Sequence, residues 1–152
     1  MAALRNRLRR AGERGSELIE LALVLPILLL IIAGIIDFGF LFQRYEVVTN
    51  AAREGARIAV LPGYSNADVT ARVQQYLTAG GLSNSPTVTP TTGSVTLPSG
   101  MIVNTVQVQV DYPSSFSFIG PMAAMVGGSG WNTITLRATS TMRSESAAGG
   151  GP

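Results

Sequence analysis

The sequence predicts an α+β fold in which a long N-terminal helix packs its outer half on a small antiparallel sheet. An apolar run long enough to cross a membrane covers residues 21–42. A helical stripe of small residues then continues the helix to about residue 60, and alternating strands follow it. Once about 60 residues are assigned to the leader and helix, the ~90 that remain suffice for one small domain.

Residues 1–15 form a basic leader. Five arginines and one glutamate give this leader a net charge of +4, whereas six arginines and eight acids give the rest of the chain −2. The high isoelectric point therefore describes the leader, and no nucleic-acid-binding face is expected. Arginines beside a spanning segment stay inside, so the leader is expected to be cytoplasmic.

The first part of the helix is the expected membrane span. Leu21–Phe42 has 22 residues, or roughly 33 Å of helix, which exceeds the ~30 Å of hydrocarbon in a bilayer. A cleaved secretory signal is a poorer interpretation, because the run is longer than such signals use and no A-x-A site follows it. An unprocessed signal anchor stays open.

Three residues of the span have two interpretations each. Glu20 is either a polar boundary residue or a carboxylate that enters the membrane and needs a cationic partner. Asp37 is either interfacial or paired with a group such as an arginine on a neighbouring subunit. Pro26 is either simply tolerated, or it marks a segment that bends or melts when subunits pack.

After the span the helix becomes amphipathic, over residues 43–60. One stripe is made of small and apolar residues that let a sheet or a second helix approach closely. Pro62-Gly63 ends the helix. The helix as a whole is expected over residues 16–60, and the residues expected to pack are Val48, Ala51, Ala52, Gly55 and Ile58, with Ala59 beside them.

Residues 61–143 are expected to form a small extracytoplasmic α+β domain, followed by a flexible tail at 144–152. Asn66 or Asp68 would cap a short helix at Val69–Thr78, which would place Tyr76 on the side of its apolar residues. Val106, Val108 and Val110 alternate with polar residues and mark the clearest strand. The expected strands are Thr87–Thr89 and Ser94–Leu97 (both weak), Ile102–Tyr112 and Trp131–Met142; an apolar loop, Pro113–Gly130, would pack on the domain or on a neighbour.

The residues that usually carry catalysis or bind metals are missing. The sequence has no His and no Cys, and its carboxylates are scattered. No phosphate-binding loop or nucleophile elbow is present. We therefore expect no enzyme activity, no metal and no cofactor, and favour a binding or structural role.

Two stretches carry a family resemblance. Gly15-Ser-Glu-Leu-Ile-Glu20 behind a basic leader looks like a type IV prepilin signal. The run from Glu20 through Gly34-Ile-Ile-Asp-Phe-Gly39 to Thr49-Asn-Ala-Ala-Arg-Glu-Gly-Ala-Arg57 resembles the TadE-like pseudopilins of Tad (Flp) pilus systems. The resemblance covers about residues 15–60 and implies a pilin-like fold.

The resemblance also implies a processing step and partners. A prepilin peptidase would cleave between Gly15 and Ser16 on the cytoplasmic face, and the Glu20 carboxylate would help assembly by pairing with the Ser16 amine of a neighbour. Gly12, followed five residues later by Glu17, is a second possible register. Expected partners are the peptidase, other Tad pilins, the inner-membrane assembly platform and the lipid bilayer. Leu21 stands where the short Flp major pilins carry Tyr, and this favours a minor pilin.

Overall fold

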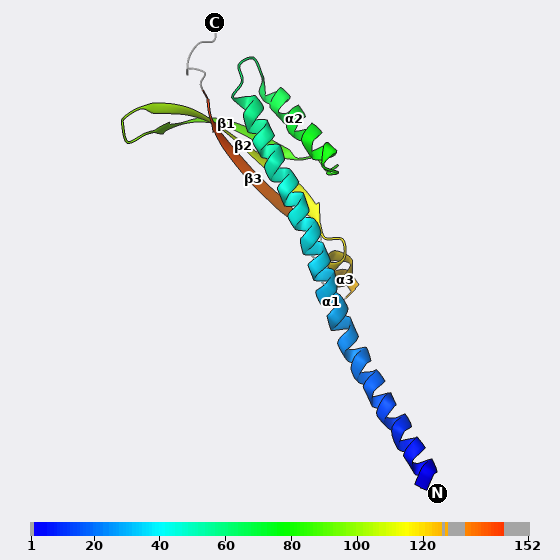
Figure 1. Ribbon diagram of the computed structural model, residues 1–152. Coiled ribbons are helices and arrows are strands. Elements are labelled where there is room, and N and C mark those ends of the chain that lie inside the picture. Colours follow the sequence, from blue (N-terminus) through cyan, green and yellow to red (C-terminus); the bar gives the residue numbers. More distant parts are fainter. Residues whose placement is uncertain (1, 126, 128–132, 145–152) are drawn as a thin grey trace.

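In the computed structural model, the C-terminal part of one long helix packs against a small three-stranded sheet, which confirms the α+β class (Figure 1). The structure describes residues 2–125, 127 and 133–144, and their side chains from residue 17 onward except at 123 and 125. The elements are α1 (Ala2–Ala59), α2 (Asn66–Ala79), β1 (Thr87–Thr96), β2 (Ile102–Ser115), α3 (Ile119–Met125) and β3 (Thr133–Arg143).

Helix α1 is longer than the sequence predicted, because it begins in the leader. It continues through Pro26 without a break and ends at Ala59. Pro62 cannot continue the helical hydrogen bonds, and Gly63 follows with a φ of 86°. The N-terminal half of α1 projects away from the domain, and the C-terminal half lies across one face of the sheet beside α2 (Figure 1).

The start of α2 is capped by a residue that the sequence analysis did not choose. The Ser65 hydroxyl accepts a hydrogen bond from the Asp68 amide at 3.3 Å, and the Asp68 carboxylate accepts one from the Ser65 amide at 2.8 Å. This reciprocal pair is a capping box, so the predicted caps Asn66 and Asp68 are wrong by one and three positions. Tyr76, predicted on the apolar side of α2, is exposed.

The sheet is antiparallel, with the strand order β1-β2-β3. The two weak strands predicted at 87–97 are one strand, β1, because all ten of its residues pair with β2. The predicted loop from Pro113 is also wrong at its start and in its middle: β2 continues to Ser115, and α3 follows. The end of that predicted loop and the predicted tail from residue 145 lie outside the described residues.

The core lies between the sheet and the two helices. Alternate residues of β2 point to it, as the sequence predicted for its valines. Leu136 and Ala138 join them from β3, whereas Ile134 is exposed. The fully buried side chains, or nearly so, are Val48, Ala51, Ala52 and Ala56 of α1, Val69, Val73 and Leu77 of α2, and Val108 and Val110 of β2.

Candidate functional site

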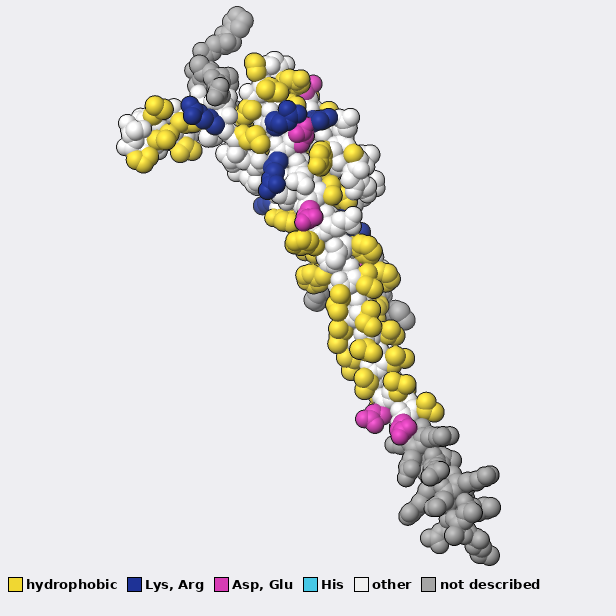
Figure 2. All heavy atoms as spheres, viewed as in Figure 1, with side chains coloured by type: hydrophobic (Ala, Val, Ile, Leu, Met, Phe, Trp, Pro, Cys, Tyr) yellow, Lys and Arg dark blue, Asp and Glu magenta, His cyan; other side chains and the backbone are white. Residues whose placement is uncertain are grey.

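Residues 18–42 of α1, which we call its apolar half, form a nearly continuous apolar surface (Figure 2). Its large apolar side chains between Leu18 and Phe42 are mostly exposed, from 41% at Ile36 to 71% at Leu23. By length and composition, α1 is the one helix of the described chain that could cross a membrane. Such a surface is costly in water and favourable in lipid, so it is consistent with single-pass membrane anchoring.

Asp37 is the polar residue that the structure hides on this half of the helix. Its side chain is only 2% exposed. The carboxylate accepts hydrogen bonds from the backbone amides of Ser117 (2.9 Å), Phe118 (2.9 Å) and Ile119 (2.6 Å). These amides precede and open α3, where backbone N–H groups have no partner within the helix. The sequence left two alternatives open for Asp37, an interfacial position or pairing with a group such as an arginine on a neighbouring subunit, and the structure adds partners within its own chain.

Arg44 makes a second link between α1 and the same segment, two turns further along the helix. Its guanidinium donates to the Ser114 hydroxyl at 2.9 Å and to the Ser115 carbonyl at 2.7 Å. Ser114 is buried although it is polar, so this hydrogen bond supplies the partner that its hydroxyl needs. We call Asp37, Arg44 and the segment 114–119 the clamp, because together they tie α1 to the end of β2 and the start of α3.

Beyond the clamp, the stripe of small residues on α1 touches the rest of the domain. Val48, Ala51, Ala52, Gly55 and Ile58 are all buried there. Gly55 marks a close approach, because a Cβ at this position would lie 2.6 Å from Cγ2 of Val73 on α2 and 3.3 Å from Cγ1 of Val108 on β2. Only a glycine lets the helix, α2 and the sheet meet at this distance.

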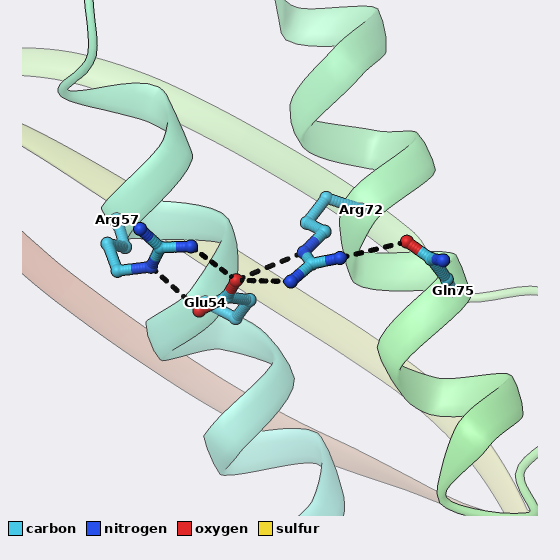
Figure 3. Close-up of polar contacts among 4 residues, drawn as sticks. All are labelled: Glu54, Arg57, Arg72 and Gln75. Carbon is cyan, nitrogen blue, oxygen red and sulfur yellow. Dashed lines mark hydrogen bonds and ion pairs between the residues drawn. The ribbon is translucent and has the colours of Figure 1, made fainter.

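Glu54 joins α1 to α2 on the solvent side of this contact (Figure 3). Its carboxylate binds Arg57 one turn away and Arg72 on α2, each at 2.8 Å, and Arg72 also donates to Gln75. Hydrogen bonds from Arg57 and Arg72 lower the pKa of Glu54 to about 2. Sequence reasoning missed this bridge, because Arg72 is 18 residues away and on another helix.

The remaining residues singled out by the sequence lie toward the N-terminal end of α1. The backbones of Gly15 and Ser16 are helical within α1, and their side chains lie outside those that the structure describes. Glu20 and Pro26 are exposed on the surface of the helix. Glu20 and Pro26 therefore face outward, at roughly 52 Å and roughly 44 Å of helix from Gly55.

Hollows on the domain include two that are lined by residues the structure describes. One, of about 620 Å³, is lined by residues of α1 and α2 that include Arg57, Tyr64 and Arg72. The other, of about 150 Å³, lies beside Arg44, Asn84 and Tyr112. Among the residues that the structure describes, no three His, Cys, Asp or Glu side chains converge as metal ligands. The polar groups nearest these hollows bind one another: Arg72 bonds to Glu54, and Asn84 bonds through its amides to Tyr112 and Pro113.

Comparison with known proteins identifies one family. A family model described as TadE-like protein matches residues 15–57. The match begins at Gly15 and ends near the end of α1, so it spans the apolar half, the two α1 residues of the clamp, and most of the small-residue stripe. It confirms the family resemblance that the sequence predicted for this segment. Comparisons with curated proteins and with solved structures found no match.

Proposed function

We propose that this TadE-like chain is a minor pilin of a Tad-type pilus, processed by a prepilin peptidase and used in pilus assembly, priming or adhesion. The family match over residues 15–57 carries the proposal. The exposed apolar half of α1 supports it, because one such surface can serve both a bilayer before assembly and neighbouring pilin helices afterwards. A domain of this size on the helix favours a minor subunit over a short major pilin.

The proposed processing step follows from the order of residues at the start of the helix. Cleavage after Gly15 would remove the basic leader and leave Ser16 as a new amino terminus. Glu20 would then stand four residues from an ammonium group. A carboxylate in hydrocarbon costs about 2.5–3.5 kcal/mol on insertion scales, and pairing with the Ser16 amine of a neighbouring subunit would offset this cost during assembly.

The proposed location is the cytoplasmic membrane, with the leader inside and the domain outside. The concentration of arginine in the leader supports this orientation. The partners that we propose are the prepilin peptidase, other Tad pilins and the assembly platform in the membrane. We further infer that the chain acts through contacts between helices and not through catalysis, since its sequence lacks His and Cys.

The test is the intact mass and N-terminal sequence of the protein isolated from membranes, with and without the prepilin peptidase of its host. We expect a chain that begins at Ser16 only when the peptidase is present, and a full-length chain for Gly15→Ala. A chain that begins at Glu13 would move the processing site to Gly12 and the key acid to Glu17. Full-length protein beside an active peptidase would refute the proposal and favour an unprocessed anchor that presents a binding domain.

A second measurement separates processing from assembly. Glu20→Gln removes the negative charge but keeps the side chain's size, and we expect the variant to be cleaved normally yet to enter pili poorly. Glu17→Gln is the matched control, because Glu17 is exposed on the same part of α1. Equal recovery of both variants in sheared pili would contradict the role proposed for Glu20.

A further inference from the structure

The clamp fixes where α3 lies relative to the apolar run of α1. Asp37 is five residues before Phe42, the end of that run, which corresponds to about 7.5 Å along a helix. The amide groups of Phe118 and Ile119 bond directly to the Asp37 carboxylate. The start of α3 must therefore lie at the depth of Asp37 when α1 spans a membrane.

The segment around α3 has the composition of a membrane-embedded segment. Between Asp111 and Arg137 the sequence contains no charged residue. Phe118 is 46% exposed, and Ile119 and Met122 are partly exposed. Helix α3 packs directly on α1 (Figure 1).

Asp37 also removes the main obstacle to placing this segment in lipid. A bilayer supplies no partner for the unpaired N–H groups at the start of a helix. One carboxylate accepts from the amides of Ser117, Phe118 and Ile119, so these polar groups are satisfied inside the protein. The same bonds stabilise the carboxylate, which would otherwise be an unpaired charge at membrane depth.

We propose that α3 and the turn Phe116–Phe118 before it are immersed in the leaflet on the domain's side and contact lipid acyl chains. The chain then contacts the membrane through two elements, the α1 span and a short helix fastened to it. The inference rests on the membrane-spanning role of α1, and it does not depend on processing or on entry into a pilus. Lipid is the favoured occupant of this apolar surface, because the hydrogen bonds to Asp37 hold the start of α3 within the length of the exposed apolar run.

The first test uses the unmodified, full-length protein in vesicles of phosphatidylethanolamine and phosphatidylglycerol, at a low ratio of protein to lipid. A lipid-soluble diazirine is activated by light, and the modified residues are located by tandem mass spectrometry. We expect adducts on residues 21–42 and on 116–122, and none on 104–112. Adducts on the span but not on 116–122 would overturn the inference and leave the proposed function untouched. Adducts on neither segment would refute the span as well.

The second test uses the absence of cysteine from the sequence, since one introduced cysteine is then a unique labelling site. Spin labels at Phe118→Cys, Phe38→Cys and Ser94→Cys report the test position, a lipid reference on the span and a water reference on β1. All three native side chains are exposed, so these changes should leave the core intact.

We expect the Phe118→Cys label to collide readily with oxygen and rarely with a water-soluble nickel reagent, like the label at Phe38→Cys. Collisions at Phe118→Cys that match those at Ser94→Cys would overturn the inference. Spin–spin broadening at Phe118→Cys under the same dilute conditions would identify a second copy of the chain, and not lipid, as the occupant, and would also overturn it.

Discussion

The apolar half of α1 (residues 18–42) and the half that follows it (43–59) both present apolar side chains, yet they use side chains of different size for different surroundings. The N-terminal half carries Leu, Ile and Phe, and most of these are exposed. The C-terminal half buries mainly Ala, Gly and Val against α2 and the sheet. Large side chains maximise contact with a fluid lipid phase, whereas small ones let rigid elements approach closely. The size of the apolar residues thus distinguishes the exposed half, which is suited to a membrane, from the half that packs in the domain.

The largest expected effect on stability comes from placing a large side chain at a glycine of the packed half, with a glycine of the apolar half as the control. Gly55→Leu should destabilise the domain by about 3 kcal/mol, because even its Cβ would clash with Val73 and press on Val108. Gly34→Leu is the matched control: nothing lies within 4 Å of a Cβ built there, and the change should be neutral or slightly stabilising. Hydrogen exchange of the β2 amides in detergent micelles measures both. Equal losses would contradict the distinction between the halves.

Asp37 breaks the pattern of the N-terminal half, and its removal should have the next largest effect. Asp37→Ala leaves three amides without their acceptor, and we expect α3 to lose about 2 kcal/mol of local stability. Asp37→Asn keeps one acceptor oxygen and should lose less. Exchange rates of the Phe118 and Ile119 amides provide the readout. Unchanged rates in Asp37→Ala would show that the Asp37 carboxylate does not hold the clamp together.

The bridge at Glu54 should make the stability of the C-terminal half of α1 in the domain depend on pH. Since the folded pKa is about 2 against an ordinary 4.5, its stabilisation is present above pH 4.5 and is lost as the pH falls toward 2. At neutral pH Glu54→Gln should cost about 1 kcal/mol, because both arginines are partly in solvent.

Comparing Glu54→Gln with the wild-type protein isolates this contribution, because the pKa values of Asp68 and Asp111 are lowered as well. The stability difference between the two proteins, measured by denaturant unfolding in micelles, should shrink from pH 6 to pH 2. Glu46→Gln, at an exposed position of the same half-helix, is the control for removing one negative charge from α1. A difference that stays constant with pH would contradict the assignment.

The smallest effect is expected at the far end of the β1–β2 hairpin, which projects beyond the helices (Figure 1). Val95 and Ile102 are exposed there and lie outside the buried part of β2. Val95→Thr and Ile102→Thr should each change the free energy of unfolding by less than about 0.5 kcal/mol. Val108→Thr, in the buried part of β2, is the contrasting control. A large loss of stability at either hairpin position would indicate that the side chain packs against a neighbouring molecule, since it is exposed in the single chain.

Local patterns predicted much of the fold. The small-residue spacing on α1 and the alternation of Val106, Val108 and Val110 reflect the geometry of a single helix and a single strand, and both patterns match the buried faces. The single strand β1 was harder to predict, because its Pro90 and Gly93 are of types that are depleted in strands and are held by pairing with β2.

The contacts of the candidate site depend on long-range geometry and escaped prediction. Asp37 bonds to amides 80 to 82 residues away, and Arg44 bonds to Ser114 at a separation of 70. Nothing in the sequence around Asp37 specifies these partners. The one local signal was the position of Asp37, because an acid inside an apolar run needs hydrogen-bond or charge partners. The backbone amides of the uncharged, apolar segment around residue 118 could have been considered as these partners.

The position of the clamp has a mechanical consequence. The domain is attached to α1 from Asp37 to Ile58, which corresponds to about 32 Å of helix, and these attachments lie side by side along the helix axis. Tension applied along α1 therefore loads all of these attachments at the same time, in shear, and does not break them one after another. Pulling on one molecule between the N-terminal end of α1 and the C-terminal end of β3 should thus give a single rupture. A series of small steps would show that the attachments break one at a time.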